Sequence, residues 1–422
     1  MYKERFKSHH DANRALKTAF QTNENAYDYL TRKLNKDDLK DRVLYLHVPY
    51  CKKICSFCPF SKYSKVEKAS YDQYLMDRVD EIKDYKFIRS KAFKSVYFGG
   101  GTPTALEPRQ IDNVLNHLQK KMPLDDRVEI SLESSISELD DEMLSVLKAH
   151  GVNRLSIGVQ TFNDLGRRLL NRRGSGDFVK KRLEVIQKII PNTNIDIIYN
   201  YPGQSIQNLK EDIKVVKDLD IGGLSFYSLM IHKNTPLEKT ITRAELEIMH
   251  NIQREKVFFD HLVNDLSDEG YEMFELTKLI KDKRDEYKYI DIKHQGGHCV
   301  PIGVKAGGRI GRYSFFNPET MMPLSKNMNI SARGRMVSDK YLEIEKVLNQ
   351  LQHGRIVLDE HPIIQEVMLK ESLTDLLERL IHHDYIQLTN KEIRFKNDGF
   401  FYGNNIISDF SKIMIDSFSE EN

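Results

Sequence analysis

The chain has 422 residues, 40% of them hydrophobic and 30% charged, with 64 Lys and Arg against 62 Asp and Glu. This composition is typical of a soluble globular protein with two or three domains, or with one barrel and an appendage. The near-zero net charge argues against a nucleic-acid-binding domain that depends on phosphate contacts. No apolar stretch approaches the ~20 residues that cross a bilayer, and the first residues lack the apolar core of a signal peptide. We therefore expect a cytoplasmic protein without a membrane span.

Residues 1–40 are polar and charged, and helical patterning at 12–20 and 27–34 predicts an N-terminal helical arm. From residue 43 onward, strand-like and helix-like segments alternate. The expected strands are residues 44–48, 95–98, 128–132, 154–157, 194–198 and 223–227. The expected helices are residues 71–85, 108–120, 140–149, 178–190 and 206–219.

This alternation predicts parallel β/α units joined by right-handed connections. We therefore expect an α/β fold whose core is a partial (β/α)6 barrel. The carboxyl ends of its strands share one rim, which is where barrels of this kind build their active sites. We place this core, together with a substrate-side extension, at residues 41–335.

After residue 242 the pattern changes. We expect a long helix at 243–266, a strand at 270–276, and a charged loop or exposed turn at 278–287. Helical patterns at 341–351 and 363–381 precede a β-prone segment at 385–401 and a last helix at 404–417. This order predicts a small C-terminal α+β cap of winged-helix type at residues 336–422.

Three of the four cysteines, Cys51, Cys55 and Cys58, fall within eight residues directly after the first predicted strand. Their C-x3-C-x2-C spacing differs from the paired C-x2-C hooks of tetrahedral zinc sites. Three thiolates suit a [4Fe–4S] cluster that keeps one iron open for a small chelating ligand. Two other interpretations stay open: a zinc site completed by His47 or a distant residue, and free thiols in a loop. Cys299 stands alone.

Glycines and polar residues follow the other predicted strands. The glycine-rich run at 99–104 lacks the features of a phosphate loop and of a dinucleotide site. Beside a cluster, bare glycines suit an amino-acid ligand that chelates iron, because they let the backbone approach it closely. Glu133 and Asp196 can accept from an amine or from ribose hydroxyls, and Gln160 and Arg172 can bind a carboxylate or a sugar. Taken singly, the run is also typical of a tight turn and each polar residue of a surface position.

Together these motifs resemble the radical S-adenosylmethionine (SAM) family. The resemblance rests on the three cysteines with Tyr-x-His-x-Pro ahead of them, on Gly-Gly-Gly-Thr-Pro-Thr, on Ser-Ile-Gly-Val-Gln-Thr-Phe, and on the Asp-Ile-Ile-Tyr-Asn-Tyr-Pro-Gly-Gln segment that begins at Asp196. Within that family the chain is similar to the coproporphyrinogen III dehydrogenase (HemN/HemW) branch. This branch includes the HemW-type haem chaperones and the enzymes of anaerobic haem use. The resemblance runs from about residue 43 to residue 318, and it is weaker in the cap.

The resemblance implies that Cys51, Cys55 and Cys58 hold a [4Fe–4S] cluster whose open iron is chelated by the SAM amine and carboxylate. It also implies a set of SAM-binding residues: Tyr45, Gly100, Gly101, Thr102, Glu133, Gln160, Arg172 and Asp196. One electron passed to the sulfonium would cleave a C–S bond and give a 5′-deoxyadenosyl radical. A flavodoxin, a ferredoxin or a flavin reductase is the implied electron donor.

Departures from the branch patterns indicate the subfamily. The dehydrogenase usually carries another Cys two residues after the third, where this chain has Phe60. The haem chaperones typically read Leu-Gly-Arg-x-His and carry a Trp-containing segment, whereas this chain reads Leu-Asn-Arg-Arg-Gly at 170–174 and has no Trp. Residues 306–314 instead resemble the Ala-Gly-Gly…Gly-Gly-Tyr-Ser stretch of the haem-degrading enzymes. Lys305 departs from this pattern, because a smaller residue is common there.

A haem substrate needs an apolar slot and cations for two propionates, and it can take an axial ligand. Arg309 and Arg312 could pair with the propionates bidentately. His294, His298 and Cys299 could offer the axial ligand. Solvated arginines and structural His or Cys residues are the alternatives.

We therefore predict a radical SAM enzyme that acts on haem. It would transfer a methyl or a deoxyadenosyl-derived equivalent to the porphyrin, open the ring and release iron. Three alternatives remain: a haem chaperone that leaves haem intact, a coproporphyrinogen III dehydrogenase, and a cluster-bearing structural protein. Haem or a related tetrapyrrole is the expected partner, and no nucleic-acid partner is expected.

Overall fold

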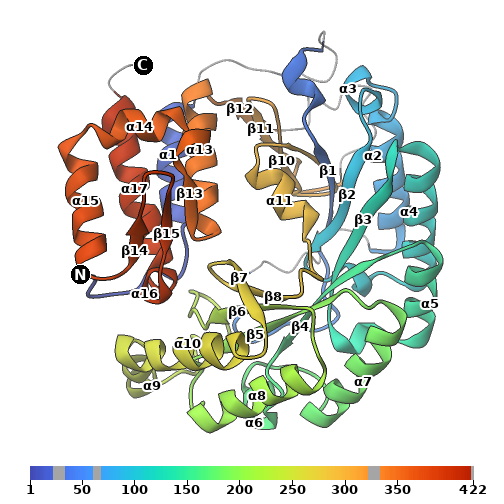
Figure 1. The fold of residues 1–422 in the computed structure, drawn as a ribbon. Coiled ribbons are helices and arrows are strands. Elements are labelled where there is room, and N and C mark those ends of the chain that lie inside the picture. Colours follow the sequence, from blue (N-terminus) through green and yellow to red (C-terminus); the bar gives the residue numbers. More distant parts are fainter. Residues whose placement is uncertain (22–33, 60–67, 322–332, 420–422) are drawn as a thin grey trace.

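Six parallel strands, each followed by a helix, form the core of the protein (Figure 1). The computed structural model describes residues 1–21, 34–59, 68–321 and 333–419. The six strands are β1 (Arg42–Val48), β2 (Phe93–Gly100), β3 (Leu124–Ser134), β4 (Arg154–Gln160), β5 (Thr193–Tyr199) and β6 (Gly223–Ser228). They lie in sequence order and pair in parallel throughout. The predicted α/β fold with a partial (β/α)6 barrel is confirmed.

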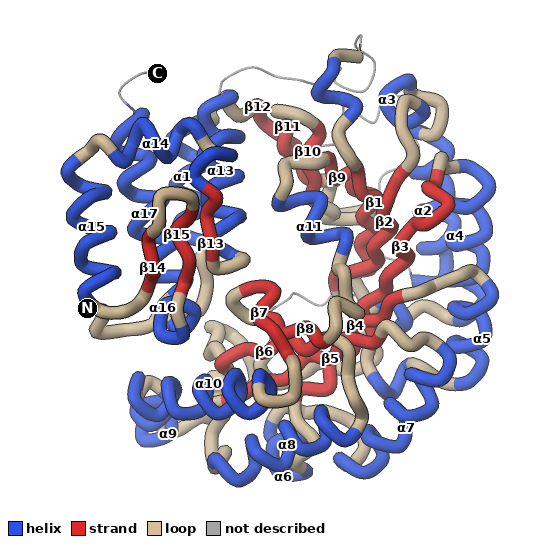
Figure 2. Tube along the Cα trace, viewed as in Figure 1, coloured by secondary structure: helices blue, strands red, loops and turns tan. Residues whose placement is uncertain are grey.

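Helices cover the outer face of these strands (Figure 2). They are α2 (Tyr71–Ile82), α4 (Pro108–Lys121), α5 (Asp141–Ala149), α7 (Gly176–Ile189) and α8 (Ile206–Asp218), with the short α3 (Lys86–Arg89) and α6 (Asp164–Leu169) between them. Each long helix turns an apolar stripe to the sheet, as Ile111, Leu115 and Leu118 do in α4. The side chains along each strand point alternately to the helices and to the interior of the barrel, because successive strand side chains point to opposite faces. In β1, Leu44 packs towards the helices while Val43 faces the interior.

The sheet extends beyond the six strands at both edges. At one edge β9 (His298–Ile302) pairs in parallel with β1, and the antiparallel strands β10 (Gly307–Ile310), β11 (Tyr313–Phe316) and β12 (Arg333–Met336) follow. At the other edge the hairpin of β7 (Tyr271–Glu275) and β8 (Lys278–Lys281) pairs antiparallel with β6. Helix α11 (Lys288–His294) lies on the inner face, where it packs Tyr289 and Ile292 against Val43 and Tyr97.

Two predictions for the region after residue 242 hold only in part. The expected helix at 243–266 is two helices, α9 (Arg243–Met249) and α10 (Ile252–Ser267), because the Asn251 side chain caps the second one by accepting from the backbone of Arg254. The charged segment at 278–287 is a turn and loop only from residue 282 onward, and it is not exposed throughout. Its first residues form β8, and Asp285 is wholly buried.

The C-terminal cap has an apolar core of its own, and its order of helices followed by a hairpin is the one predicted for a winged-helix type. It consists of α13 (Asp339–Gln352), β13 (Arg355–Val357), α14 (Pro362–Met368), α15 (Glu371–His382), β14 (Ile386–Leu388), β15 (Glu392–Phe395), α16 (Asn397–Phe401) and α17 (Gly403–Phe418). The expected helix at 363–381 is divided between α14 and α15.

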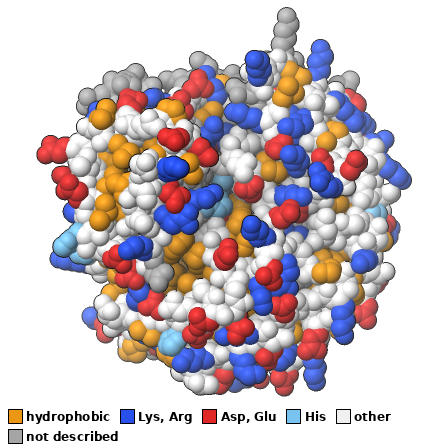
Figure 3. Space-filling model, in the orientation of Figure 1, with side chains coloured by type: hydrophobic (Ala, Val, Ile, Leu, Met, Phe, Trp, Pro, Cys, Tyr) orange, Lys and Arg blue, Asp and Glu red, His pale blue; other side chains and the backbone are white. Residues whose placement is uncertain are grey.

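The first helix of the chain packs on this cap. Leu16 and Phe20 of α1 (His10–Phe20) enter the cap core, and Figure 1 shows α1 beside α13 and α17. Residues 27–33 of the second predicted helical patch lie outside the described residues, as does Phe60. No described helix has the length and the apolar run that a bilayer crossing needs. Figure 3 shows acidic and basic side chains mixed over the face in view, as the near-zero net charge predicts.

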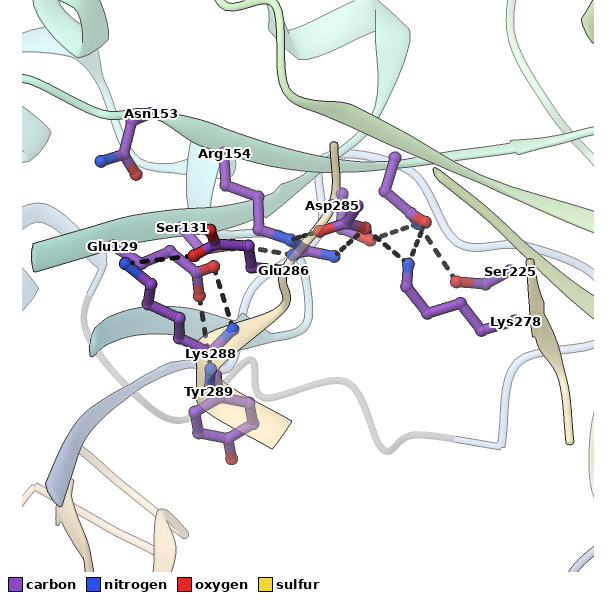
Figure 4. Close-up of polar contacts among 12 residues, drawn as sticks. Glu129, Ser131, Asn153, Arg154, Ser225, Lys278, Asp285, Glu286, Lys288 and Tyr289 are labelled. Atoms are coloured by element: carbon purple, nitrogen blue, oxygen red, sulfur yellow. Dashed lines mark hydrogen bonds and ion pairs between the residues drawn. The ribbon is translucent and has the colours of Figure 1, made fainter. Parts of the chain in front are cut away.

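A buried ion network closes the barrel at the amino-terminal ends of β4 and β5 (Figure 4). Arg154 donates from Nε and Nη2 to the two carboxylate oxygens of Asp285 at 2.7 and 3.1 Å, and Lys278 Nζ lies 2.6 Å from the same carboxylate. These three side chains are at most 2% exposed. Burial opposes the charge on Asp285, but the two cations hold the pKa of its carboxyl well below the usual range. The ring of Tyr287 lies under the Arg154 guanidinium, 4.1 Å from its Cζ.

Removal of the Asp285 carboxylate should destabilise the protein strongly. Asp285→Ala leaves Arg154 and Lys278 buried without their counter-charge, which typically costs about 3–5 kcal/mol. We expect that loss in the apparent free energy of unfolding in urea, followed by circular dichroism. Glu247→Ala is the control, since it breaks an exposed pair with Arg243 and should cost less than about 1 kcal/mol. An Asp285→Ala protein as stable as this control would contradict the account.

Candidate functional site

The cysteine loop leaves the carboxyl end of β1 and is anchored to segments far along the chain. The backbone N–H of Ser56 donates to the carbonyl of Leu170 at 3.3 Å. Asn171 Nδ2 donates to the carbonyl of Ile54 at 2.6 Å, and the backbone N–H of Leu237 donates to the carbonyl of Ser56 at 2.9 Å. The residues directly after α6 and the segment after β6 therefore hold the cysteine loop over the rim of the barrel.

The three thiols in this loop are accessible and have polar neighbours. Cys51 is exposed, Cys55 and Cys58 are half-buried, and none of the three is in a disulfide. Arg172 Nη1 donates to Cys55 Sγ at 3.0 Å, and Thr102 Oγ1 donates to Cys51 Sγ at 3.5 Å. Hydrogen bonds to sulfur are among the features that tune an iron–sulfur cluster. Three reachable thiols on one anchored loop, with donors aimed at two of them, fit such a cluster.

The glycine run lies directly beside the segment that enters the cysteine loop. In the parallel β1–β2 ladder Val48 is paired with Gly100, so the chain leaves both strands at the same place. The N–H of Gly101 then donates to the carbonyl of Val48 at 2.8 Å. A Cβ at Gly101 would lie 2.4 Å from the carbonyl oxygen of Tyr50, and one at Gly100, where φ is +117°, would lie 2.6 Å from the ring of His47. Only glycine fits these two positions.

Glu133, at the carboxyl end of β3, places a carboxyl group next to this glycine run. Its two oxygens accept from Tyr97 OH at 2.7 Å and from the backbone N–H of Gly100 at 3.0 Å. Burial raises the pKa of Glu133 to about 7, although both hydrogen bonds favour the charged form. Tyr45 lies on β1, two strands from Glu133 in the sheet, and its OH is 2.8 Å from His47 Nδ1. A carboxyl in this position can receive an amine.

Gln160, Arg172 and Asp196 surround Gly158 on β4. A Cβ at Gly158 would lie 2.9 Å from Gln160 Nε2 and 3.5 Å from Arg172 Nη2, and Arg172 also donates to the Gly158 carbonyl. A bulge between Gly158 and Gln160 gives Gln160 a φ of 73°, an uncommon value for a residue other than glycine, and such bulges re-aim a side chain. Asp196 pairs with Gly158 in the β4–β5 register and accepts from Asn194 at 3.2 Å. Burial raises the pKa of Asp196.

The structure thus brings the three cysteines, the glycine run, Glu133, Gln160 and Arg172 to one rim, and it places Tyr45 and Asp196 in the middle of β1 and β5. Sequence reasoning missed the hydroxyl of Tyr97, which orients Glu133, and the amide of Asn171, which anchors the cysteine loop. The period-two alternation of β2 could have identified Tyr97, because Ser95, Tyr97 and Gly99 share one face of that strand. The roles of these cluster and SAM residues remain predictions from the resemblance.

The four predicted substrate residues lie elsewhere. Because β9 runs parallel to β1, its first residue, His298, lies at the end of the sheet opposite to the cysteine loop, and its Nδ1 accepts from the backbone of Gly311 at 3.0 Å. Arg309 pairs with Glu345 of α13 at 2.9 Å.

The other two substrate residues also contact the cap or the segment that leads into it. Arg312 Nε donates to the carbonyl of Val337 at 2.8 Å. His294 Nδ1 lies 2.9 Å from His353 Nε2, at the end of α13. The geometry therefore does not collect the four predicted substrate residues into one group, and their roles stay predictions.

Comparisons with known proteins agree with this geometry. Residues 45–216 match the model of the radical SAM superfamily. The chain is 24% identical over 378 residues to the anaerobilin synthase of Escherichia coli O157:H7. The aligned region covers 89% of this chain and 85% of that protein. It is 25% identical over 391 residues to the heme chaperone HemW of Lactococcus lactis. The aligned region covers 89% of this chain and 98% of that chaperone. The solved structure of coproporphyrinogen III oxidase (HemN) from Escherichia coli matches the fold with a TM-score of 0.78, at 21% identity and over 94% of both chains.

Each of the three loop cysteines should be needed for cluster assembly. After anaerobic reconstitution with iron and sulfide, we expect about four irons per chain in the unmodified protein. The single variants Cys51→Ala, Cys55→Ala and Cys58→Ala should each retain at least about tenfold less iron, because each lacks one thiolate ligand. Cys299→Ala removes a buried thiol on the inner face and should retain the cluster. Iron content equal to that of Cys299→Ala in the loop variants would disprove the assignment.

Glu133 should make SAM binding dependent on pH. Its pKa of about 7 leaves the carboxyl mostly neutral at pH 6 and mostly ionised at pH 8. If the carboxylate receives the SAM amine, the affinity should rise about tenfold over that range, in proportion to the ionised fraction. Anaerobic calorimetry on reconstituted protein measures this change.

Two variants test the assignment to Glu133. Glu133→Gln should bind SAM weakly at pH 8 and should lose the pH dependence. Glu129→Gln alters a buried carboxyl that accepts from the backbone of Lys288, and it should keep the pH dependence. Affinity that is flat with pH in the unmodified protein would count against a charged Glu133 in SAM binding.

Proposed function

Because this chain belongs to the radical SAM superfamily, in the branch that holds HemN and HemW, we propose that it is an enzyme that opens the porphyrin ring of haem and releases the iron. The observation that carries the radical SAM chemistry is the meeting of three accessible thiols, a glycine run and the carboxyl of Glu133 on one rim. The haem substrate rests on the resemblance of residues 306–314 to the haem-degrading enzymes, and on similarity to an anaerobilin synthase over 89% of the chain.

The proteins of this superfamily use a [4Fe–4S] cluster and SAM, which together supply one-electron radical chemistry. In this chain Cys51, Cys55 and Cys58 would hold the cluster. Gly100 and Gly101 leave the backbone free to meet the methionine part of SAM, since neither position has room for a side chain. Further residues of the rim and of strands β1 and β5 would bind the rest of SAM: Tyr45, Thr102, Glu133, Gln160, Arg172 and Asp196.

Buried side chains fill the barrel interior on the side away from the rim. Helix α11 and the ion network of Arg154, Lys278 and Asp285 fill the interior at the amino-terminal ends of the strands. The side chains of this network are at most 2% exposed, so water is kept away from this part of the interior. Exclusion of water suppresses side reactions of a reactive intermediate.

We retain Arg309 and Arg312 as the proposed propionate partners. Both guanidinium groups already lie near carboxylates of the cap, Arg309 at 2.9 Å from Glu345 and Arg312 at 3.5 Å from Asp339. A propionate would therefore replace one carboxylate partner by another of the same chemistry. A flavodoxin, a ferredoxin or a flavin reductase is the proposed electron donor.

A haem chaperone is the second candidate. The similarity to HemW of Lactococcus lactis, which extends over 98% of that protein, favours it. Against it stand the Leu-Asn-Arg-Arg-Gly segment at 170–174 and the lack of any Trp. The two candidates differ in whether haem is altered.

Anaerobic turnover separates the two functions. Reconstituted protein is incubated with haem, SAM and a reductant, and the tetrapyrrole is analysed by mass spectrometry. We expect a linear tetrapyrrole and free iron, formed at least about a hundredfold faster than by Cys55→Ala, which lacks a thiolate ligand of the cluster. Haem that stays intact while SAM is consumed would contradict the proposal, and its transfer intact to an acceptor protein would favour the chaperone.

A further inference from the structure

Two imidazoles and one carboxylate converge where the barrel meets the cap. Glu275 is the last residue of β7, His294 is the last residue of α11, and His353 directly follows α13. Their ligand atoms all lie within 4.8 Å of one another. His294 Nδ1 is 2.9 Å from His353 Nε2 and 3.6 Å from Glu275 Oε1. None of the three belongs to the rim that carries the cysteine loop.

The backbone fixes the orientation of His353. Its Nδ1 lies 2.7 Å from the carbonyl oxygen of Phe274, which can only accept, so Nδ1 carries the proton and Nε2 carries a lone pair. Histidines that bind metals are typically oriented by such a bond from the rear nitrogen to a carbonyl or a carboxylate. The N–H of Leu276 also donates to the carbonyl of Gln352 at 2.9 Å. The hairpin that carries Glu275 is thereby attached to the end of the helix that positions His353.

The spacing of the three ligand atoms suits a small divalent ion. Bonds of about 2.0–2.2 Å in a tetrahedron place neighbouring ligand atoms about 3.4 Å apart. The two measured separations, 2.9 and 3.6 Å, fall on either side of that value. The side chains of Glu275 and His294 are each 16% exposed, so the group is shielded but still reachable by an ion.

We propose that Glu275, His294 and His353 bind a divalent transition-metal ion of the zinc type, with a fourth position for water or another ligand. The ion joins the β7–β8 hairpin, α11 and α13, and so it stabilises the cap on the barrel. In this assignment His294 serves the metal ion and not haem. The site is independent of the cluster, of SAM and of the proposed haem chemistry.

Zinc titration of full-length protein tests the site. A background with Cys51→Ala, Cys55→Ala and Cys58→Ala removes the thiolates, which would otherwise compete for zinc. After treatment with a chelator, this protein should bind one Zn²⁺ per chain in a competition titration with a chromophoric chelator, and its melting temperature should rise. The cluster-loaded protein with intact cysteines should likewise hold one zinc in addition to its iron.

Two variants of that background remove one ligand each. His353→Asn keeps a donor for the Phe274 carbonyl and deletes Nε2, whereas Glu275→Gln keeps the shape of the side chain and deletes its charge. Each should weaken zinc binding by at least about tenfold and abolish the rise in melting temperature. His382→Asn alters an exposed histidine of the cap and should change neither quantity. Circular dichroism verifies that each variant is folded.

Zinc binding that is unchanged in both His353→Asn and Glu275→Gln would overturn the proposal. So would the absence of zinc binding in the background that lacks the three loop cysteines. In that case the contact is only a hydrogen bond between two histidines at the edge of the cap. Neither result depends on whether the protein acts on haem, because no substrate is present in the titration.

Discussion

The parallel pairing of β1 with β2 is the constraint on which the site depends. It sets Val48 opposite Gly100, so the chain leaves the two strands at the same place and the cysteine loop runs beside the glycine run. Side chains would not fit in that space, because a Cβ at Gly101 would collide with the carbonyl of Tyr50. The next strand in the sheet then brings Glu133 against the N–H of Gly100. Strand register thus brings a bare backbone and a carboxyl together on one rim, and hydrogen bonds from Asn171 and Leu237 hold the thiols of the cysteine loop beside them.

At the other end of the barrel, a network of buried charged side chains connects the strands. Asp285 draws Arg154 and Lys278 into one buried network, and this ties β8 and the segment before α11 to the start of β4. The cap then rests on α11 and on the β7–β8 hairpin, through His353 and through the Leu276 N–H. One end of the barrel therefore carries the proposed chemistry, and the buried ion network and the contacts with the cap stabilise the other end.

Much of this arrangement could be predicted from local sequence. The alternation of strand-like and helix-like segments located all six core strands, and it placed the cysteine loop, the glycine run and Glu133 after strands whose carboxyl ends meet on one rim. The burial of Asp285 within the charged segment at 278–287 was not predicted, because its partner is Arg154, 131 residues away, and local pattern carries no sign of such a pair. His298 is a similar case: its distance from the cysteine loop follows from the parallel pairing of β9 with β1, which the sequence does not reveal.

The central claim is that three loop thiols leave one iron of a cluster open beside the glycine run, where SAM chelates it. Electron–nuclear double resonance on the reduced cluster tests this claim most directly, with SAM labelled by ¹⁵N at the amine and by ¹⁷O at the carboxylate. The account predicts hyperfine coupling from both labels to the cluster. A reduced cluster whose signal does not change with saturating SAM would contradict it.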